Sequence, residues 1–210
     1  MNSILFDLDG TLVDSSIGIK AAFRYTFNQL KLPLLDDKHL STFIGPPLET
    51  TFSQYFTSEK DITHAITTFR TYYNNKGVHQ VSVYQHIPEL LTSLQETGKH
   101  LFVTTSKNEP MAKLMLKEQK LDSYFDGIYG ALPDRYHKAD VIRACLKEEN
   151  IKQNSAIIIG DTAFDMIGAK KAGISSIGVT WGFGQELDLL SNGAKLICHN
   201  PLDIKKALSS

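Results

Sequence analysis

The chain has 210 residues, 42% of them hydrophobic and 21% charged, which is enough for one well-packed core and a small additional module. Its 22 basic and 23 acidic residues leave a net charge of −1, which argues against polymeric nucleic acid as a partner. No apolar run approaches the length of a membrane span, and no export signal is evident, so we expect a cytoplasmic protein without membrane contact. The two distant cysteines, Cys145 and Cys198, are expected to be buried free thiols.

The first predicted strand, Ile4 to Leu8, carries an unusual pair of acids at its end. Asp7 and Asp9 stand two residues apart, and the chain then turns at Gly10. Alternate residues of a strand point to the same face, so the two carboxylates are expected on one side. Burying charge is costly without a partner, and the stretch therefore predicts a compensating group elsewhere in the chain.

Residues 15–80 have helical periodicity and no convincing strand. Apolar residues recur at helical spacing in three stretches: Ile19, Phe23, Phe27 and Leu30; Leu48, Phe52, Tyr55 and Phe56; and Ile62, Ala65, Ile66, Phe69 and Tyr73. Helix breakers separate them, among them Gly45-Pro46-Pro47. We predict a helical domain at 15–80, inserted into a core made of 1–14 and 81–210. The stretch 43–52 is either an ordinary turn or a loop that offers free amides to an anion.

Strands and helices alternate through the rest of the chain. A helix is predicted at 88–97, and strands follow at 100–106, 125–131, 155–161, 174–181 and 195–199. Helices are predicted between and after them, at 109–119, 138–149, 164–172, 185–191 and 201–208. This alternation predicts an α/β fold with a Rossmann-like, mainly parallel sheet. The continuous run Ile157-Ile158-Ile159 indicates a central strand that is covered on both faces.

Polar residues follow four of the predicted strands: Asp7 and Asp9, Thr105 and Ser106, Lys138, and Asp161 with Asp165. Ligands of open α/β sheets bind at the carboxyl ends of the strands, so we expect these side chains to meet in one crevice. Four carboxylates would repel one another strongly without a cation. An all-oxygen ligand set favours Mg²⁺ over zinc, so the sequence predicts that a magnesium ion and Lys138 compensate the acids.

Four stretches resemble, in order, the four motifs of the haloacid dehalogenase superfamily. They are FDLDGTLVDS (6–15), VTTS (103–106), Lys138 within YHKADVI, and IIIGDTAFDM (157–166). The helical insertion, the stretch 43–52 and WGFG (181–184) look like the phosphoglycolate phosphatase-like branch, which has a small helical cap. The resemblance implies an α/β core with an all-helical cap. WGFG is expected either to serve the fold or to line the site entrance.

The resemblance also implies the chemical roles of three residues. Asp7 would be the nucleophile that forms an aspartyl phosphate. Asp9 would protonate the leaving oxygen and then activate water. Lys138 would neutralise Asp7 and the phosphoryl group. Since relatives that dehalogenate or cleave carbon–phosphorus bonds are expected to lack an acid at the position of Asp9, phosphatase or phosphomutase chemistry is favoured.

The remaining implied roles concern metal and phosphate. Mg²⁺ would be held by the side chains of Asp7 and Asp161 and the backbone carbonyl of Asp9. Asp165 would be either a further ligand or a holder of a bound water. The implied phosphate-binding groups are the Thr105 side chain, the Ser106 amide and the amides of Leu8 to Gly10.

We therefore predict a Mg²⁺-dependent phosphatase for a small phosphomonoester, because a cap that closes over the crevice limits substrate size. Phosphoglycolate, a nucleoside monophosphate, a sugar phosphate and pyrophosphate all remain candidates. A phosphomutase of the β-phosphoglucomutase type and a non-catalytic binding module are the alternatives. The sequence leaves open whether the protein is a monomer or a homodimer.

Overall fold

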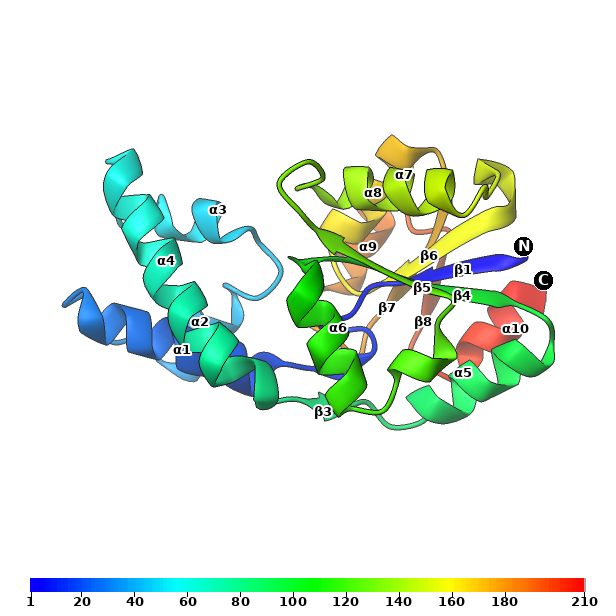
Figure 1. Ribbon diagram of the computed structural model, residues 1–210, viewed down its shortest axis with the longest axis horizontal. Coiled ribbons are helices and arrows are strands. Elements are labelled where there is room, and N and C mark those ends of the chain that lie inside the picture. The colour runs from blue at the N-terminus through cyan, green and yellow to red at the C-terminus, as the bar shows by residue number, and fades with distance from the viewer. Residues whose placement is uncertain (210) are drawn as a thin grey trace. The chain divides into compact units, whose positions relative to one another are not determined.

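The computed structural model describes residues 1–209 and contains a six-stranded sheet in the order β5-β4-β1-β6-β7-β8 (Figure 1). Its strands are β1 (Ser3–Phe6), β4 (His100–Asn108), β5 (Gly127–Ala131), β6 (Ala156–Gly160), β7 (Ser175–Val179) and β8 (Leu196–Cys198). Every neighbouring pair in this sheet is parallel. The predicted α/β class with a parallel sheet is confirmed, and each predicted strand is present.

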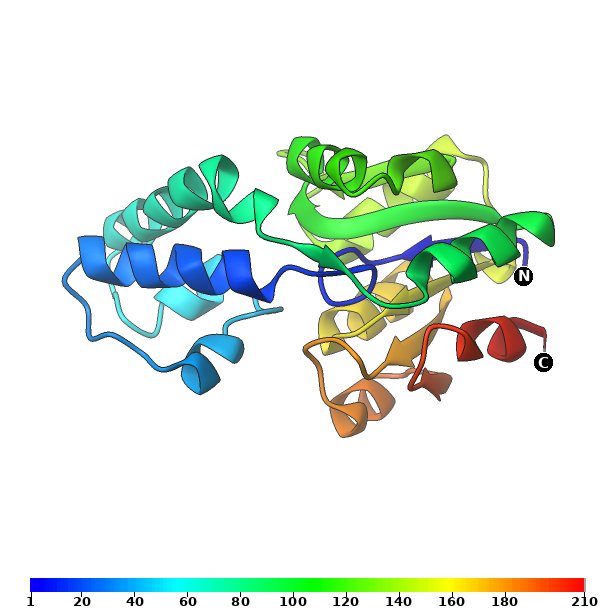
Figure 2. The same cartoon turned by 90° about the horizontal axis from the view of Figure 1, so that it is seen from below.

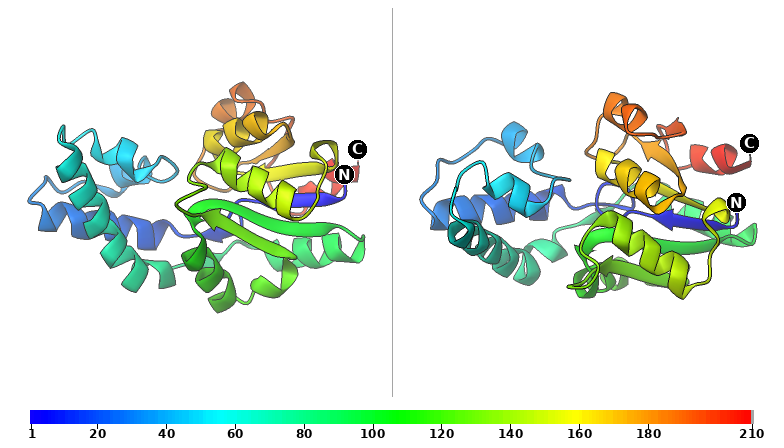
Figure 3. Two further views of the ribbon diagram at one scale, coloured as in Figure 1. Left: turned by 45° about the horizontal axis from the view of Figure 1, so that its top comes forward. Right: turned by 90° about the horizontal axis from the view of Figure 1, so that it is seen from above.

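Helices cover both faces of the sheet. On one face lie α7 (Lys138–Glu148), α8 (Ala163–Ala172) and α9 (Glu186–Ser191), with α7 and α8 side by side in Figure 3. On the other face lie α5 (Ile87–Glu96), α6 (Glu109–Glu118) and α10 (Asp203–Ser209), with α5 next to α10 in Figure 2. The crossover helices change face where the strand order reverses at β1, as right-handed connections require.

The central strands are buried on both faces. Leu5 of β1 lies between Phe102 of β4 and Ile158 of β6, and all three belong to one apolar cluster. Cys145 of α7 joins this cluster, and Cys198 of β8 is also buried; both are free thiols, as predicted. Burial raises the pKa of Cys198 to about 11 and that of Cys145 still further, so neither is a reactive thiolate at neutral pH.

A second, two-stranded sheet was not predicted. Strand β2 (Val13–Asp14) pairs antiparallel with β3 (Ser82–Val83), joining Val13 to Val83 and Asp14 to Ser82. Strands of two residues are too short to produce a readable alternation. The pair fixes the point where the chain leaves the α/β unit beside the point where it returns.

The chain divides into two compact units, one formed by Met1–Asp14 and Ser82–Ser210, the other by Ser15–Val81. The second unit, here called the helical insertion, contains α1 (Ser16–Gln29), α2 (Asp37–Ser41), α3 (Leu48–Phe52), α4 (Glu59–Asn75) and the short 3₁₀ helix η1 (Gly77–His79). Its core is aromatic. The centroid of the Phe23 ring lies 5.1 Å from that of Phe43, 5.8 Å from that of Phe52 and 4.6 Å from that of Phe69. The regular elements of this insertion are all helical.

Among residues 1–209, no helix combines the length and the apolar composition that crossing a bilayer requires.

Candidate active site

The carboxyl ends of three neighbouring strands bring the predicted acids together. Strand β1 lies between β4 and β6; Asp7 and Asp161 directly follow β1 and β6, and Thr105 lies in the second half of β4. The Asp7 amide donates to the Ile159 carbonyl at 2.9 Å, which continues the ladder one residue past the end of β1. All three side chains are buried, with Asp161 fully inaccessible. The predicted convergence at this edge of the sheet is therefore present.

Lys138 supplies a positive charge between the carboxylates of Asp7 and Asp165. Its Nζ lies 2.6 Å from Asp7 Oδ1 and 2.7 Å from Asp165 Oδ1, and it donates to the Thr104 carbonyl at 2.9 Å. Lys138 is the first residue of α7, where the helix dipole disfavours a positive charge. Burial would lower its pKa, but the carboxylates of Asp165 and Asp7 raise it well above its usual range. Lys138 is therefore a buried ammonium held by two carboxylates.

Three carboxylates form a cluster that a metal ion fits. Asp7, Asp161 and Asp165 each offer an oxygen, and these oxygens lie within 4.8 Å of one another. Burial, with the neighbouring charges of Asp165 and Asp9, raises the pKa of Asp7 to about 6 against the opposing effect of Lys138. Burial and the charges of Asp165 and Asp7 raise the pKa of Asp161 well above its ordinary value. One lysine does not balance three buried acids, and a hard divalent cation such as Mg²⁺ suits this oxygen-only donor set.

The WGFG stretch holds Asp161 in place. The Phe183 amide donates to Asp161 Oδ2 at 2.8 Å, and the Thr11 hydroxyl donates to Oδ1 at 3.0 Å. The Trp181 indole N–H in turn donates to the Thr11 carbonyl at 3.0 Å. A Cβ at Gly182 would lie 2.4 Å from Asp161 Oδ2, so only glycine allows this approach. The loop serves the geometry of the site, a role that the sequence left open.

Asp165 has two structural partners as well as its place in the cluster. Its Oδ2 accepts hydrogen bonds from the Thr162 amide at 3.0 Å and the Thr162 hydroxyl at 2.8 Å, forming a capping box at the start of α8. Its Oδ1 pairs with Lys138. The spacing Thr162-x-x-Asp165 is the sequence signal for such a cap. Asp165 therefore orients Lys138 and caps α8, and its predicted role at a metal or a bound water stays a prediction.

The three predicted phosphate-binding residues differ in their surroundings. Thr105 is buried and its hydroxyl oxygen accepts from the Lys107 amide at 3.2 Å, which leaves the hydroxyl hydrogen to donate elsewhere. Ser106 is exposed. Gly10 has φ +86°, donates its amide to the Val13 carbonyl at 2.8 Å, and has Asp161 Oδ2 where a Cβ would be. The structure thus explains Gly10 by its turn and its close approach to Asp161, and the phosphate contacts stay predictions.

Asp9 pairs with a lysine that the sequence did not indicate. Its Oδ2 lies 2.9 Å from the Nζ of Lys107, and the two side chains are 19% and 7% exposed. The other oxygen, Oδ1, is buried and accepts no hydrogen bond from residues 1–209. The Asp9 side chain lies outside the cluster of Asp7, Asp161 and Asp165, which agrees with a separate chemical role.

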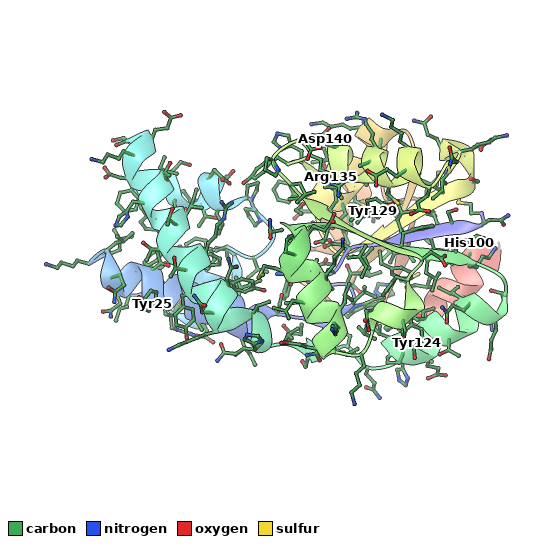
Figure 4. All side chains as sticks on the ribbon, in the orientation of Figure 1. Tyr25, His100, Tyr124, Tyr129, Arg135 and Asp140 are labelled. Carbon is green, nitrogen blue, oxygen red and sulfur yellow. The ribbon has the colours of Figure 1, made fainter. Side chains whose placement is uncertain are left out.

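A hollow of about 480 Å³ lies elsewhere on the α/β unit, between α6, β5 and the loop that follows β5. Its lining includes Glu109, Tyr129 and Arg135, and none of the predicted site residues. In Figure 4 Arg135 lies beside Tyr129, with its guanidinium 5.5 Å from the ring centroid. Arg135 also pairs with Glu109 and Glu148, so its charge is compensated within the protein. These contacts fasten α6 and the loop to the edge strand.

The comparisons with known families, structures and sequences agree on one family for this chain. Residues 4–179 match the model of the haloacid dehalogenase-like hydrolase family. A haloacid dehalogenase-like hydrolase from Streptococcus pneumoniae superposes with a TM-score of 0.95 at 43% identity, covering 99% of this chain and 98% of the other. A protein described as a predicted phosphatase from Clostridium acetobutylicum gives 0.94 at 42% identity, covering 100% and 99%. A 5'-nucleotidase of Pseudomonas aeruginosa is 35% identical over 99% of this chain and 96% of its own length.

Proposed function

Because this chain belongs to the haloacid dehalogenase-like hydrolase family and is a phosphatase of that family, we propose that it hydrolyses a small phosphomonoester with Mg²⁺ through an aspartyl phosphate on Asp7. The observation that carries this proposal is the pairing of Asp7. Lys138 holds Oδ1 of this buried carboxylate, which leaves Oδ2 for attack on phosphorus. Asp9, two residues further on, supplies a second carboxyl with one oxygen unpartnered.

The first step transfers the phosphoryl group to the protein. Asp7 attacks phosphorus, the bond between phosphorus and the ester oxygen breaks, and that oxygen takes the proton of the Asp9 carboxyl. Lys138 offsets the negative charge on Asp7 and the phosphoryl oxygens. The Thr105 hydroxyl, whose oxygen already accepts from the Lys107 amide, donates its hydrogen to a phosphoryl oxygen. The alcohol leaves and Asp9 is then a carboxylate.

The second step returns Asp7 to its starting state. Asp9 accepts a proton from water as the water oxygen attacks phosphorus. The bond between phosphorus and the Asp7 oxygen breaks, inorganic phosphate leaves, and both carboxyl groups are as they began. The same residue acts first as an acid and then as a base, so it has to reach both the leaving oxygen and the entering water from one position.

The side chains of Asp7 and Asp161 and the backbone carbonyl of Asp9 would hold Mg²⁺, with Asp165 beside them. When bound, the ion would neutralise charge on the carboxylates and the phosphoryl oxygens. Thr11 and Phe183 keep Asp161 oriented toward the cluster. The surplus of buried negative charge in the cluster supports this assignment.

Nucleoside 5'-monophosphates are the first substrate class to test. The Pseudomonas aeruginosa relative named 5'-nucleotidase aligns over nearly the whole of both chains. Phosphoglycolate, sugar phosphates and pyrophosphate follow, since the described residues of the site recognise a phosphoryl group and do not distinguish these leaving groups.

The test is phosphate release from a broad panel of phosphorylated metabolites, with Mg²⁺ and with a chelator. We expect turnover that requires Mg²⁺ and falls by at least about 10⁴-fold in Asp7→Asn. The matched control is Asp140→Asn on α7, an aspartate that is 41% exposed at its side chain and paired with Arg143, which should retain activity. An active Asp7→Asn variant would contradict the proposal. Isomerised sugar phosphate without free phosphate would instead identify a phosphomutase.

A further inference from the structure

We propose that Lys107 is a positioning residue for Asp9: its ammonium holds Asp9 Oδ2 and thereby directs Oδ1 to the leaving oxygen and later to water. This inference rests on the proposed function and extends it to a residue outside the four motifs. The Lys107 Nζ lies 2.9 Å from Asp9 Oδ2.

The backbone of β4 is irregular where it carries Lys107. In the pairing of β4 with β5, Thr104 lies opposite Tyr129 and Asn108 lies opposite Ala131, so β4 uses two more residues than its neighbour. Such bulges re-aim side chains and are frequent beside active sites. The Lys107 amide donates to the Thr105 hydroxyl at 3.2 Å within this irregular stretch. Lys107 therefore lies in the irregular part of β4, and from there its side chain reaches Asp9.

Burial shows that this contact differs from a surface ion pair. The Lys107 side chain is only 7% exposed, and a buried ammonium is costly unless a carboxylate accompanies it. Exposed lysine pairs of this protein, such as Lys113 with Glu109, keep the lysine largely in solvent at 55% exposure. Because the Lys107 side chain is largely removed from solvent, its ammonium has a defined position relative to Asp9, the proposed acid.

The unpartnered oxygen of Asp9 is the second independent observation. Oδ1 is buried and accepts no hydrogen bond from any residue the structure describes, which costs stability. Because Oδ2 faces the ammonium donor, Oδ1 is the oxygen that can exchange a proton with the substrate and with water. Holding Oδ2 therefore places both the proton of the first step and the basic oxygen of the second step on the same atom.

The test uses leaving groups of different basicity. An alkyl ester such as a nucleoside 5'-monophosphate expels a strongly basic oxygen and needs the acid, whereas p-nitrophenyl phosphate expels a weakly basic one and needs it little. The quantity to compare is kcat/KM, which reports the step that forms the aspartyl phosphate. In Lys107→Met we expect a fall of about 100-fold for the alkyl ester and at most about threefold for the aryl ester.

Three further variants separate positioning from other roles. Lys107→Arg retains a charged donor and should restore part of the activity toward the alkyl ester. Lys113→Met, the matched lysine on α6, should leave both substrates unchanged. In the Asp9→Asn background, adding Lys107→Met should cause little further loss, because the residue it positions is already inactive. Thermal melts establish that each variant is folded at the assay temperature.

Two kinds of result would overturn the inference. An equal fall for both esters, or a rise in KM alone, would mean that Lys107 binds phosphate and does not act through Asp9. A full additional loss in the Asp9→Asn background would have the same meaning. If the wild-type protein releases phosphate from no phosphorylated metabolite of the panel, the proposed function itself fails; if only the selectivity is missing, the role of Lys107 fails alone.

Discussion

The α/β unit and the helical insertion bury different kinds of side chain. Beneath the carboxyl edge of its sheet, the α/β unit buries Asp7, Lys138, Asp161 and Asp165. Within Ser15–Val81 the buried polar residues are uncharged: Ser15, Thr26 and Thr51. The Thr26 hydroxyl is satisfied within its own helix by the Ala22 carbonyl at 2.8 Å.

Side chains that only pack and side chains that can react are therefore buried in different units of the same chain. Aromatic contacts around Phe23 stabilise the insertion by excluding water, which any well-packed core does. Buried carboxylates around one lysine are weak contributors to stability, because desolvation costs as much as their attraction returns. A reacting centre needs such charged groups, so their burial in the α/β unit is explained by chemistry and not by stability.

Lys138→Met should produce the largest combined effect, because it leaves Asp7 and Asp165 buried without their cation. We expect the free energy of unfolding to fall by about 3 kcal/mol and kcat/KM by about 10³-fold. Urea unfolding and phosphate release measure the two effects. The control is Lys147→Met, an exposed lysine of the same helix. Unchanged stability in Lys138→Met would remove the contrast between the two units.

Trp181→Phe sharpens the contrast at the proposed metal site. The change keeps an aromatic ring but removes the N–H that donates to the Thr11 carbonyl, and Thr11 orients Asp161. Removing such a supporting hydrogen bond should weaken Mg²⁺ binding about tenfold, as measured by isothermal titration calorimetry. Undiminished affinity would show that the Trp181 N–H does not act on Asp161 through Thr11.

Phe23→Leu should have the smallest effect on chemistry. It loosens the aromatic core of the insertion, and we expect a loss of about 1 kcal/mol in local stability. Hydrogen exchange should accelerate in α1 and α4, while amides of β1 and β6 keep their protection and Mg²⁺ affinity is unchanged. Equal acceleration in β1 would mean that the two units unfold together and that the contrast is one of composition alone.

The sequence was sufficient for most elements of the α/β unit. Its strands are short apolar runs bounded by turns, and the continuous run Ile157-Ile158-Ile159 marked β6 as a central strand. Helical spacing was less reliable in the insertion. The predicted helix from Leu48 to Phe56 ends at Phe52, and Tyr55 packs against Phe27 from the turn that follows. An apolar residue at helical spacing can indicate packing even beyond the end of the helix.

The sequence predicted those site residues that come after a strand. It did not predict the residues whose position depends on the local path of the backbone. Asp7, Asp161 and Lys138 meet as their positions after strands suggested. Lys107 was missed because it reaches Asp9 from the irregular part of β4, which no residue pattern marks. Phe183 was missed because it contributes its amide and not its side chain.

The most direct test of the central claim is to trap the phosphorylated carboxylate. Asp9→Asn, mixed with p-nitrophenyl phosphate and Mg²⁺, should form the aspartyl phosphate without needing the acid and then hydrolyse it slowly, because Asp9 no longer activates water. Acid quenching followed by peptide mass spectrometry is expected to find phosphate on Asp7. Phosphate release without any adduct in this variant, or an adduct on a different residue, would contradict the account.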